Sequence, residues 1–178
     1  DSGTVGSQRA FGGFPQRVLD MTFAPDGSYW LLGRAEAEEG DVEIRHYNPS
    51  NGQGRSFPFS KNIITNGKSQ PFKIYPYTRL IRTHEAKLLA TGVNCLLAQL
   101  DPRSGRYQYF DYTPAFIGKN ETVRAIALAE SPDGTWWIGT QQGLVKGIPD
   151  GNARRFELTQ ATPGNTQGLN NNSIACLL

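Results

Sequence analysis

The chain has 178 residues and a formal net charge of +2, from 18 basic and 16 acidic residues spread along its length. Because the positive charge is not concentrated, nucleic acid and anionic membrane are excluded as expected partners of this region. Charged residues make up only 19% of the sequence, whereas Gly (20) and Pro (11) are plentiful. This composition predicts many short elements joined by tight turns.

No stretch of roughly 18 apolar residues occurs, so the sequence predicts no segment that spans a bilayer. The chain starts at Asp1, without Met and without a basic-then-apolar leader. We therefore expect a processed or excised chain.

A first unit of four short strands is predicted over residues 17–59. Its first turn is Pro25-Asp26-Gly27, and Asp followed by Gly tolerates the positive φ that short hairpin turns need. An insertion at 35–40 lengthens its second turn. The expected strands are 17–23, 28–33, 42–47 and 55–59.

A second, weaker unit is predicted over residues 72–112, which lack both Trp and the Asp-Gly pair. His84-Glu85-Ala86-Lys87 stands where the first unit has Pro-Asp-Gly. A strong turn follows at Asp101-Pro102-Arg103-Ser104-Gly105. The expected strands are 78–84, 87–92, 94–100 and 106–112.

A third unit is predicted over 122–158, where Pro132-Asp133-Gly134 repeats the first turn 107 positions after Pro25. Half of that offset, about 53, is close to the ~40–50 residues of a four-stranded propeller blade. The expected strands are 122–129, 135–140, 143–148 and 153–158. Residues 62–70 and 160–172 are predicted to be long polar connections, and 173–178 to begin a further blade.

The predicted fold is therefore all-β. It is an incomplete β-propeller of about three four-stranded antiparallel blades plus the first strand of a fourth. Propellers close with typically 4–8 blades, so the ring needs further sequence or another chain.

The third unit resembles the repeat of two-component regulator propellers. The run Asp133-Gly134-Thr135-Trp136-Trp137-Ile138-Gly139-Thr140, followed by Gly143-Leu144, matches the family repeat closely. Gly168-Leu169-Asn170-Asn171-Asn172-Ser173-Ile174 is similar to the segment that joins such repeats. The match is strong over 122–178, moderate over 17–59 and weak over 72–112.

The resemblance implies the periplasmic sensor region of a hybrid two-component system of the Bacteroidetes type, without enzymatic activity in this region. It implies an oligosaccharide as ligand, a homodimer in the full-length form, and an anchor in the inner membrane through segments outside this chain. It also implies a histidine kinase and DNA-binding regions further on, which regulate glycan-utilisation genes. Two alternatives stay open: a protein-interaction propeller without a small ligand, and a propeller polysaccharide lyase or hydrolase.

Aromatic residues in the predicted connections are the candidates for ligand contact, because loops on a rigid scaffold commonly carry binding. They are Phe72, Tyr75, Tyr77 and Phe116. The three Trp residues, Trp30, Trp136 and Trp137, fall at repeat positions and are interpreted as packing residues.

No catalytic residue, metal ligand or cofactor is predicted. Asp26 and Asp133 precede Gly in turns, which a local hydrogen bond explains. His46 and His84 have no second ligand at zinc spacing, and ordinary hydrogen-bonded roles are expected for both. The acidic cluster Glu36, Glu38, Glu39 and Asp41 is interpreted as a solvated loop. Cys95 and Cys176 lie in apolar runs and are expected to be buried free thiols.

Overall fold

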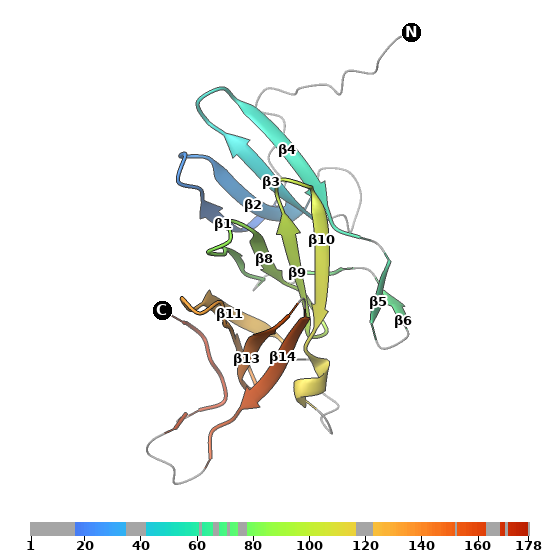
Figure 1. The fold of residues 1–178 in the computed structure, drawn as a ribbon, viewed down its shortest axis with the longest axis vertical. Coiled ribbons are helices and arrows are strands. Elements are labelled where there is room, and N and C mark those ends of the chain that lie inside the picture. Colours follow the sequence, from blue (N-terminus) through green and yellow to red (C-terminus); the bar gives the residue numbers. More distant parts are fainter. Residues whose placement is uncertain are drawn as a thin grey trace.

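The computed structural model contains three four-stranded antiparallel sheets, which follow one another from top to bottom in Figure 1. We call them blades 1, 2 and 3. The structure describes residues 17–34, 42–60, 62–65, 68–70, 72–74, 78–116, 123–151, 153–162, 168–169 and 171–177. The predicted all-β architecture of four-stranded antiparallel sheets is confirmed.

Each blade is a meander in which strands that are consecutive in sequence pair with one another. Blade 1 contains β1 (Arg17–Phe23), β2 (Tyr29–Arg34), β3 (Val42–Asn48) and β4 (Gln53–Pro58). Blade 2 contains β7 (Leu80–Arg82), β8 (Leu88–Thr91), β9 (Leu96–Asp101) and β10 (Arg106–Asp111). Blade 3 contains β11 (Ala125–Glu130), β12 (Trp136–Thr140), β13 (Gly143–Asp150) and β14 (Ala153–Thr159).

Two short elements lie in the connections between blades. The hairpin β5 (Ile63–Thr65) and β6 (Lys68–Gln70) occupies residues predicted to be only a polar connection. These residues do connect blades 1 and 2, but the hairpin within them was not predicted; Ile63 is buried in the core between the two blades and anchors the hairpin there. The 3₁₀ helix η1 (Thr113–Phe116) follows blade 2.

The turns after the first strand of each blade share one hydrogen-bond pattern. In blade 1 the Ala24 N–H donates to the Ser28 carbonyl and the Gly27 N–H donates to the Ala24 carbonyl. Thr83, Ala86 and Lys87 repeat this pattern in blade 2, and Ser131, Gly134 and Thr135 repeat it in blade 3. The turn predicted from Pro-Asp-Gly therefore also forms from His84-Glu85-Ala86-Lys87.

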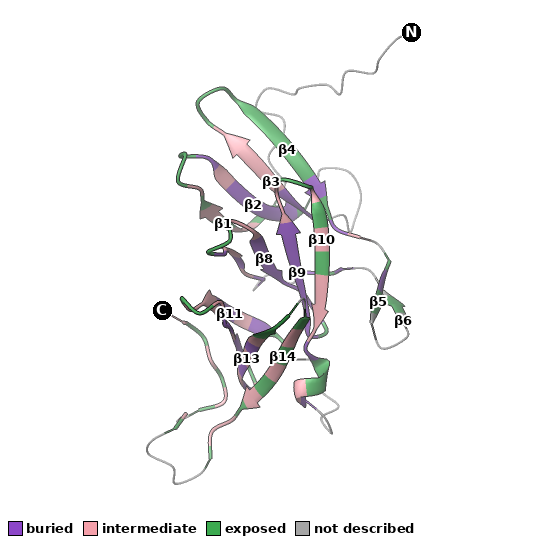
Figure 2. Cartoon of the chain, in the orientation of Figure 1, coloured by how far each residue is buried: buried purple, intermediate pink, exposed green. Residues whose placement is uncertain are grey.

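Two hydrophobic cores join the blades face to face. The first lies between blades 1 and 2 and includes Trp30, Leu32, Ile44, Leu88 and Leu100. The second lies between blades 2 and 3 and includes Leu89, Leu97, Tyr112, Trp136 and Ile138. Figure 2 shows β9 almost wholly buried, as expected for a strand of the central blade. It shows β4 almost wholly exposed, as expected for the outer strand of its blade.

Side chains also tie the first strands of neighbouring blades together. The Leu80 N–H of blade 2 donates to Asp20 Oδ2 of blade 1 at 2.8 Å. Arg79 Nε then donates to the Ile126 carbonyl of blade 3 at 2.9 Å. The register shifts after Val18 in β1 and after Ala125 in β11, so Leu19 and Ile126 are bulged at positions that correspond in the repeat. These contacts place β1, β7 and β11 beside one another.

The segment after blade 3 lies against that blade but is not a strand in its described part, 171–177. Its backbone contact with the blade is made by the Ile174 N–H, which donates to the Thr140 carbonyl at 2.9 Å. A Cβ atom on Gly139 would lie 2.7 Å from the Ile174 carbonyl, so glycine permits this close approach. Residues 173–177, the described part of the strand predicted at 173–178, form no strand, because a strand requires a row of backbone hydrogen bonds and only Ile174 donates one to blade 3.

Candidate functional site

The predicted ligand-contact residues divide into two groups. Tyr75 and Tyr77 lie outside the described residues. Phe72 is 3% exposed and its ring stacks on Phe59 with centroids 4.4 Å apart. Phe116 is 4% exposed and packs beside Tyr112. Both described rings belong to the cores between blades, and ligand contact by any of the four stays a prediction.

The Asp-Gly turns are held by local hydrogen bonds, as predicted. Asp133 accepts from Ser131 Oγ at 2.6 Å and from the Thr135 N–H and Oγ1 at 3.0 Å each. These donors, led by the Ser131 hydroxyl, lower the pKa of Asp133 from 3.8 to about 2. Hydrogen bonds from Ser28 lower the pKa of Asp26 in the same way. Both carboxylates therefore stabilise turns.

A chain of hydrogen bonds joins Asp26, Ser28 and His46 in blade 1. Ser28 Oγ donates to Asp26 Oδ1 at 2.6 Å and lies 2.7 Å from His46 Nε2. Serine stands in the middle of this chain, whereas a hydrolytic triad needs histidine between the other two groups. Ser28 is also only 1% exposed. The arrangement supports a role in packing and none in nucleophilic attack.

The second histidine belongs to a polar contact between blades 2 and 3. Glu130 Oε2 accepts from the His84 N–H at 2.6 Å and lies 2.8 Å from His84 Nδ1. Trp136 Nε1 donates to the other oxygen of Glu130 at 3.3 Å. The Glu130 side chain is only 7% exposed. Its carboxylate therefore fixes the first turn of blade 2 to blade 3.

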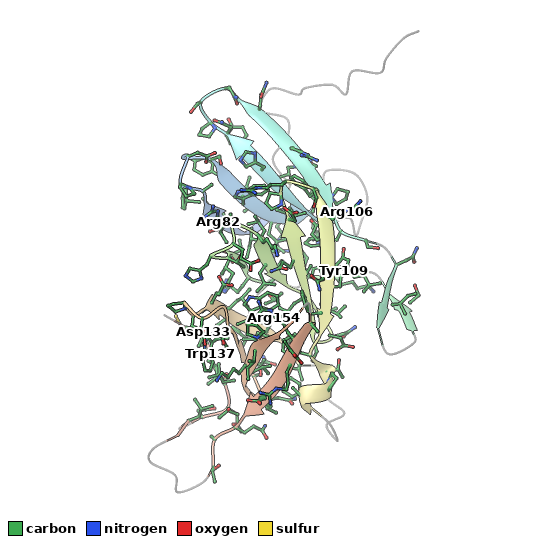
Figure 3. The ribbon with its side chains drawn as sticks, in the orientation of Figure 1. Arg82, Arg106, Tyr109, Asp133, Trp137 and Arg154 are labelled. Atoms are coloured by element: carbon green, nitrogen blue, oxygen red, sulfur yellow. The ribbon has the colours of Figure 1, made fainter. Side chains whose placement is uncertain are left out.

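Arg154 completes this contact from the last strand of blade 3. Its guanidinium carbon lies 3.3 Å from the centroid of Trp136. Its Nη1 donates to the Gly134 and Gly147 carbonyls at 2.6 and 3.0 Å. Figure 3 labels Arg154 in blade 3. Sequence reasoning missed Glu130 because its strand was expected to end at 129; its place just before the Ser131 turn was the available signal.

The two cysteines have different environments. Cys95 is buried, and burial, with the nearby Asp111 charge, raises its pKa to about 12. Cys176 is exposed, which corrects the expectation of a buried thiol. It lies in the segment 171–177, which is not part of a sheet, so its apolar sequence run is not packed into a core.

One apolar face of blade 1 packs against no other blade within the described ranges. We call Val18, Met21, Phe23, Tyr29 and Tyr47 the open face of blade 1. Val18, Met21 and Phe23 are 43%, 44% and 62% exposed. Phe23 lies opposite Tyr29, which lies opposite Tyr47, so the three rings form one row.

The repeat explains this open face. Tyr29 holds the position, two residues after the turn, that Leu88 holds in blade 2 and Trp136 holds in blade 3. Leu88 and Trp136 are both 0% exposed, because the preceding blade covers them. The open face therefore has the character of a surface that packs against another sheet.

Within the described ranges, no group of three or more His, Cys, Asp or Glu side chains is placed to hold a metal ion. None of the helices in these ranges is long and apolar enough to cross a membrane.

The four-stranded meanders pack face to face, and their first strands lie side by side. This arrangement is that of an incomplete β-propeller. No known family profile matches the sequence. No curated protein matches it either.

Solved structures share the fold. Two crystal structures of the extracellular domain of BT4673 from B. thetaiotaomicron, described as a one-component and as a hybrid two-component system, match with TM-scores of 0.58 and 0.59 at 18% identity. They cover 89% and 90% of this chain, which spans only 18% of theirs. Virginiamycin B lyase from Staphylococcus aureus matches with a TM-score of 0.52 at 14% identity, over 82% of this chain and 41% of the lyase. At these identities the shared property is the propeller fold.

Proposed function

We propose that this chain is part of the ligand-sensing propeller of a hybrid two-component sensor. The observation that carries the proposal is the fold match, over about nine-tenths of the chain, to the extracellular domain of such a system. The repeat at Asp133–Leu144 and the joining segment at Gly168–Ile174 support it independently, because both resemble two-component regulator propellers. This region binds and does not catalyse; the kinase and DNA-binding regions belong to other parts of the protein.

The proposed location is the periplasm, with an anchor in the inner membrane through other segments and a homodimer as the working form. Because the chain spans 18% of the matched structures, most of the sensor region is contributed by other sequence. Further blades against the open face of blade 1 account for the exposure of Phe23 and Met21. Ligand binding then shifts the balance between two arrangements of the sensor and sets the kinase state.

The proposed ligand is an oligosaccharide released during glycan breakdown, and the sensor controls glycan-utilisation genes. Titration of the complete sensor region with a panel of glycan fragments by calorimetry tests this. We expect heat with one fragment class and reporter-gene induction by the same fragment in cells. Absence of heat with every fragment, while the kinase still responds in cells, would overturn direct sensing.

Tyr75→Ala and Tyr77→Ala are the first variants to titrate. Phe72 and Phe116 are buried in cores, so their replacement would destabilise the fold as well as any ligand contact. The expected result is weaker binding with an unchanged unfolding temperature. Tyr109→Phe, at a ring half-buried beside Phe72, is the matched control and should leave ligand affinity unchanged.

The open face of blade 1 favours a second candidate, a protein-interaction propeller without a small ligand. Its exposed apolar side chains would suit a protein partner as well as another blade. A stable, stoichiometric protein complex that Phe23→Ser abolishes, together with no response to any glycan, would favour it. The lyase match supports a third candidate only at the level of the fold, and product release from a polysaccharide panel tests it.

A further inference from the structure

The hairpin turn between β3 and β4, at the upper tip of blade 1 in Figure 1, carries an Asn-Gly pair. Asn51 and Gly52 are both exposed, and a Cβ atom on Gly52 would meet nothing within 4 Å. An asparagine before glycine can react with its own backbone, because no Cβ atom hinders the approach of the glycine nitrogen to the side-chain amide. The second Asn-Gly pair of the sequence, Asn66-Gly67, lies outside the described residues.

The Asn51 side chain is held over the backbone that follows it. Its Oδ1 accepts the Gln53 N–H at 2.9 Å, and its Nδ2 donates to Gln53 Oε1 at 3.4 Å. The first hydrogen bond closes a ring that includes Gly52 and keeps the side chain folded toward the main chain. It also withdraws electron density from Cγ, so that atom is more open to attack by the Gly52 nitrogen.

The Gly52 nitrogen differs from its counterpart in blade 2. The third and fourth strands of both blades are joined by four residues, 49–52 and 102–105, and the last is a glycine with φ of 67° or 70°. The Gly105 N–H donates to the Asp101 carbonyl at 2.8 Å. Within the described ranges the Gly52 N–H has no such acceptor. A nitrogen whose hydrogen is not held by a carbonyl loses its proton to solvent base more readily.

The Asp-Gly pairs in the first turns of blades 1 and 3 are protected from the same ring closure. The Gly27 and Gly134 N–H groups donate to carbonyls of their own turns at 3.0 and 2.8 Å. Hydrogen bonds from neighbouring hydroxyls lower the pKa of Asp26 and Asp133, and an ionised carboxylate resists attack. These two carboxylates are held in place, whereas Asn51 offers a neutral amide next to an unheld N–H.

We propose that Asn51 is a deamidation site, at which the chain converts this residue to aspartate and isoaspartate. The Gly52 nitrogen loses its proton and bonds to Asn51 Cγ, the Cγ–Nδ2 bond breaks, and ammonia leaves. Water then opens the cyclic imide at either of its two carbonyl carbons. Opening at Cγ gives aspartate, and opening at the main-chain carbonyl gives isoaspartate. Each product carries one more negative charge, which lowers the formal net charge of +2 by one.

Peptide mass spectrometry of the whole folded chain, sampled over time at neutral and mildly alkaline pH, tests the proposal. The peptide that contains 49–53 should gain the mass difference between an amide and an acid. Its rate should rise about tenfold per pH unit, because the nitrogen must first lose a proton. Asn51→Ser, which installs the residue that blade 2 has at Ser104, should abolish the gain. No mass gain in the peptide of the unaltered chain would overturn the proposal.

Ser104→Asn separates the effect of the structure from that of the dipeptide alone. It places the same Asn-Gly pair in the equivalent turn of blade 2, where the Gly105 N–H is held. Deamidation at position 104 should be about two- to tenfold slower than at Asn51, because an ordinary hydrogen bond must first break. In denaturant the two rates should become equal. Equal rates in the folded chain, with an unchanged unfolding temperature, would overturn the assignment of Asn51 as a site selected by the fold.

Discussion

Blade 2 and the two blades that flank it build the same first turn from different residues. Blades 1 and 3 place Gly27 and Gly134 at φ values of 79° and 78°, and blade 2 places Ala86 at 60°. In all three the backbone hydrogen bonds are the same. Blades 1 and 3 thus use residues that favour the turn locally, whereas blade 2 adopts it against the preference of alanine.

Burial explains how blade 2 tolerates this. It is covered on both faces, and Leu88, Leu89, Leu96 and Leu97 are each 0% exposed. Among the described residues, blade 1 packs against a neighbouring blade on one face only, and Phe23 on its open face is 62% exposed. In blade 2, packing against two neighbouring blades therefore stabilises a turn that its own residues do not favour. Blade 2, whose sequence matches the repeat least well, is also the most buried of the three blades.

The largest expected effect tests whether the position two residues after the turn is equivalent in the three blades. Trp136→Ala should lower the free energy of unfolding by about 3–5 kcal/mol and Leu88→Ala by about 2–5 kcal/mol, because both side chains are fully buried. Tyr29→Ala, on the open face, should cost less than about 2 kcal/mol. Denaturant unfolding measures all three. A cost for Tyr29→Ala equal to that for Trp136→Ala would mean that the open face is covered in solution.

The next effect tests the polar contact between blades 2 and 3. Glu130→Ala should destabilise the chain by about 1–3 kcal/mol, because it leaves the His84 and Trp136 N–H groups without their acceptor. Glu85→Ala is the control, since the Glu85 side chain is 69% exposed and forms an ion pair with Lys87. An exposed pair of this kind contributes about 0–1 kcal/mol. Equal effects of the two changes would rule out a special role for Glu130.

A smaller effect tests the difference between the turns directly. Ala86→Gly should stabilise the chain by up to about 1 kcal/mol, because relief of the left-handed penalty of about 1–2 kcal/mol is partly offset by the entropy cost of glycine, about 0.5–1 kcal/mol. Gly134→Ala should destabilise it by about 1–2 kcal/mol for the opposite reason. Thermal unfolding of the two single variants provides the measurement. Destabilisation by Ala86→Gly would show that its methyl group makes a contact worth more than the strain.

The smallest effect concerns acid stability. The pKa of Asp133 is lowered from 3.8 to about 2, so the folded state favours the ionised carboxylate. The resulting stabilisation is complete above about pH 4 and is lost as pH falls toward 2. Asp133→Asn should therefore flatten the dependence of the unfolding temperature on pH between about 4 and 2. An unchanged slope in this variant would assign the acid sensitivity to other carboxylates.

The strand order of all three blades followed from turn chemistry and short apolar runs, even where the Pro-Asp-Gly signal was missing. The prediction was less successful where packing decides. Ile63 lies in a stretch that is polar overall, and its burial converts a predicted connection into the β5–β6 hairpin. Cys176 lies in an apolar run and is nevertheless exposed, because its segment does not enter a sheet.

The polar contact between blades 2 and 3 could not be predicted from local sequence either. His84 and Glu130 are 46 positions apart, and nothing in either local sequence predicts that they meet. Phe72 and Phe116 were selected as connection aromatics with access to a ligand, and their burial depends on Gly92 and Tyr112, which come from other elements.

The sequence by itself determined the repeat, because hairpin turns and alternating strands are encoded over a few neighbouring residues. It also determined the local hydrogen bonding of the Asp133 turn, because the donors lie within two residues of the carboxylate. Only the tertiary structure decided which faces are covered and that Glu130 joins two blades. Those properties depend on residues far apart in sequence, and the packing of one sheet on the next brings them together.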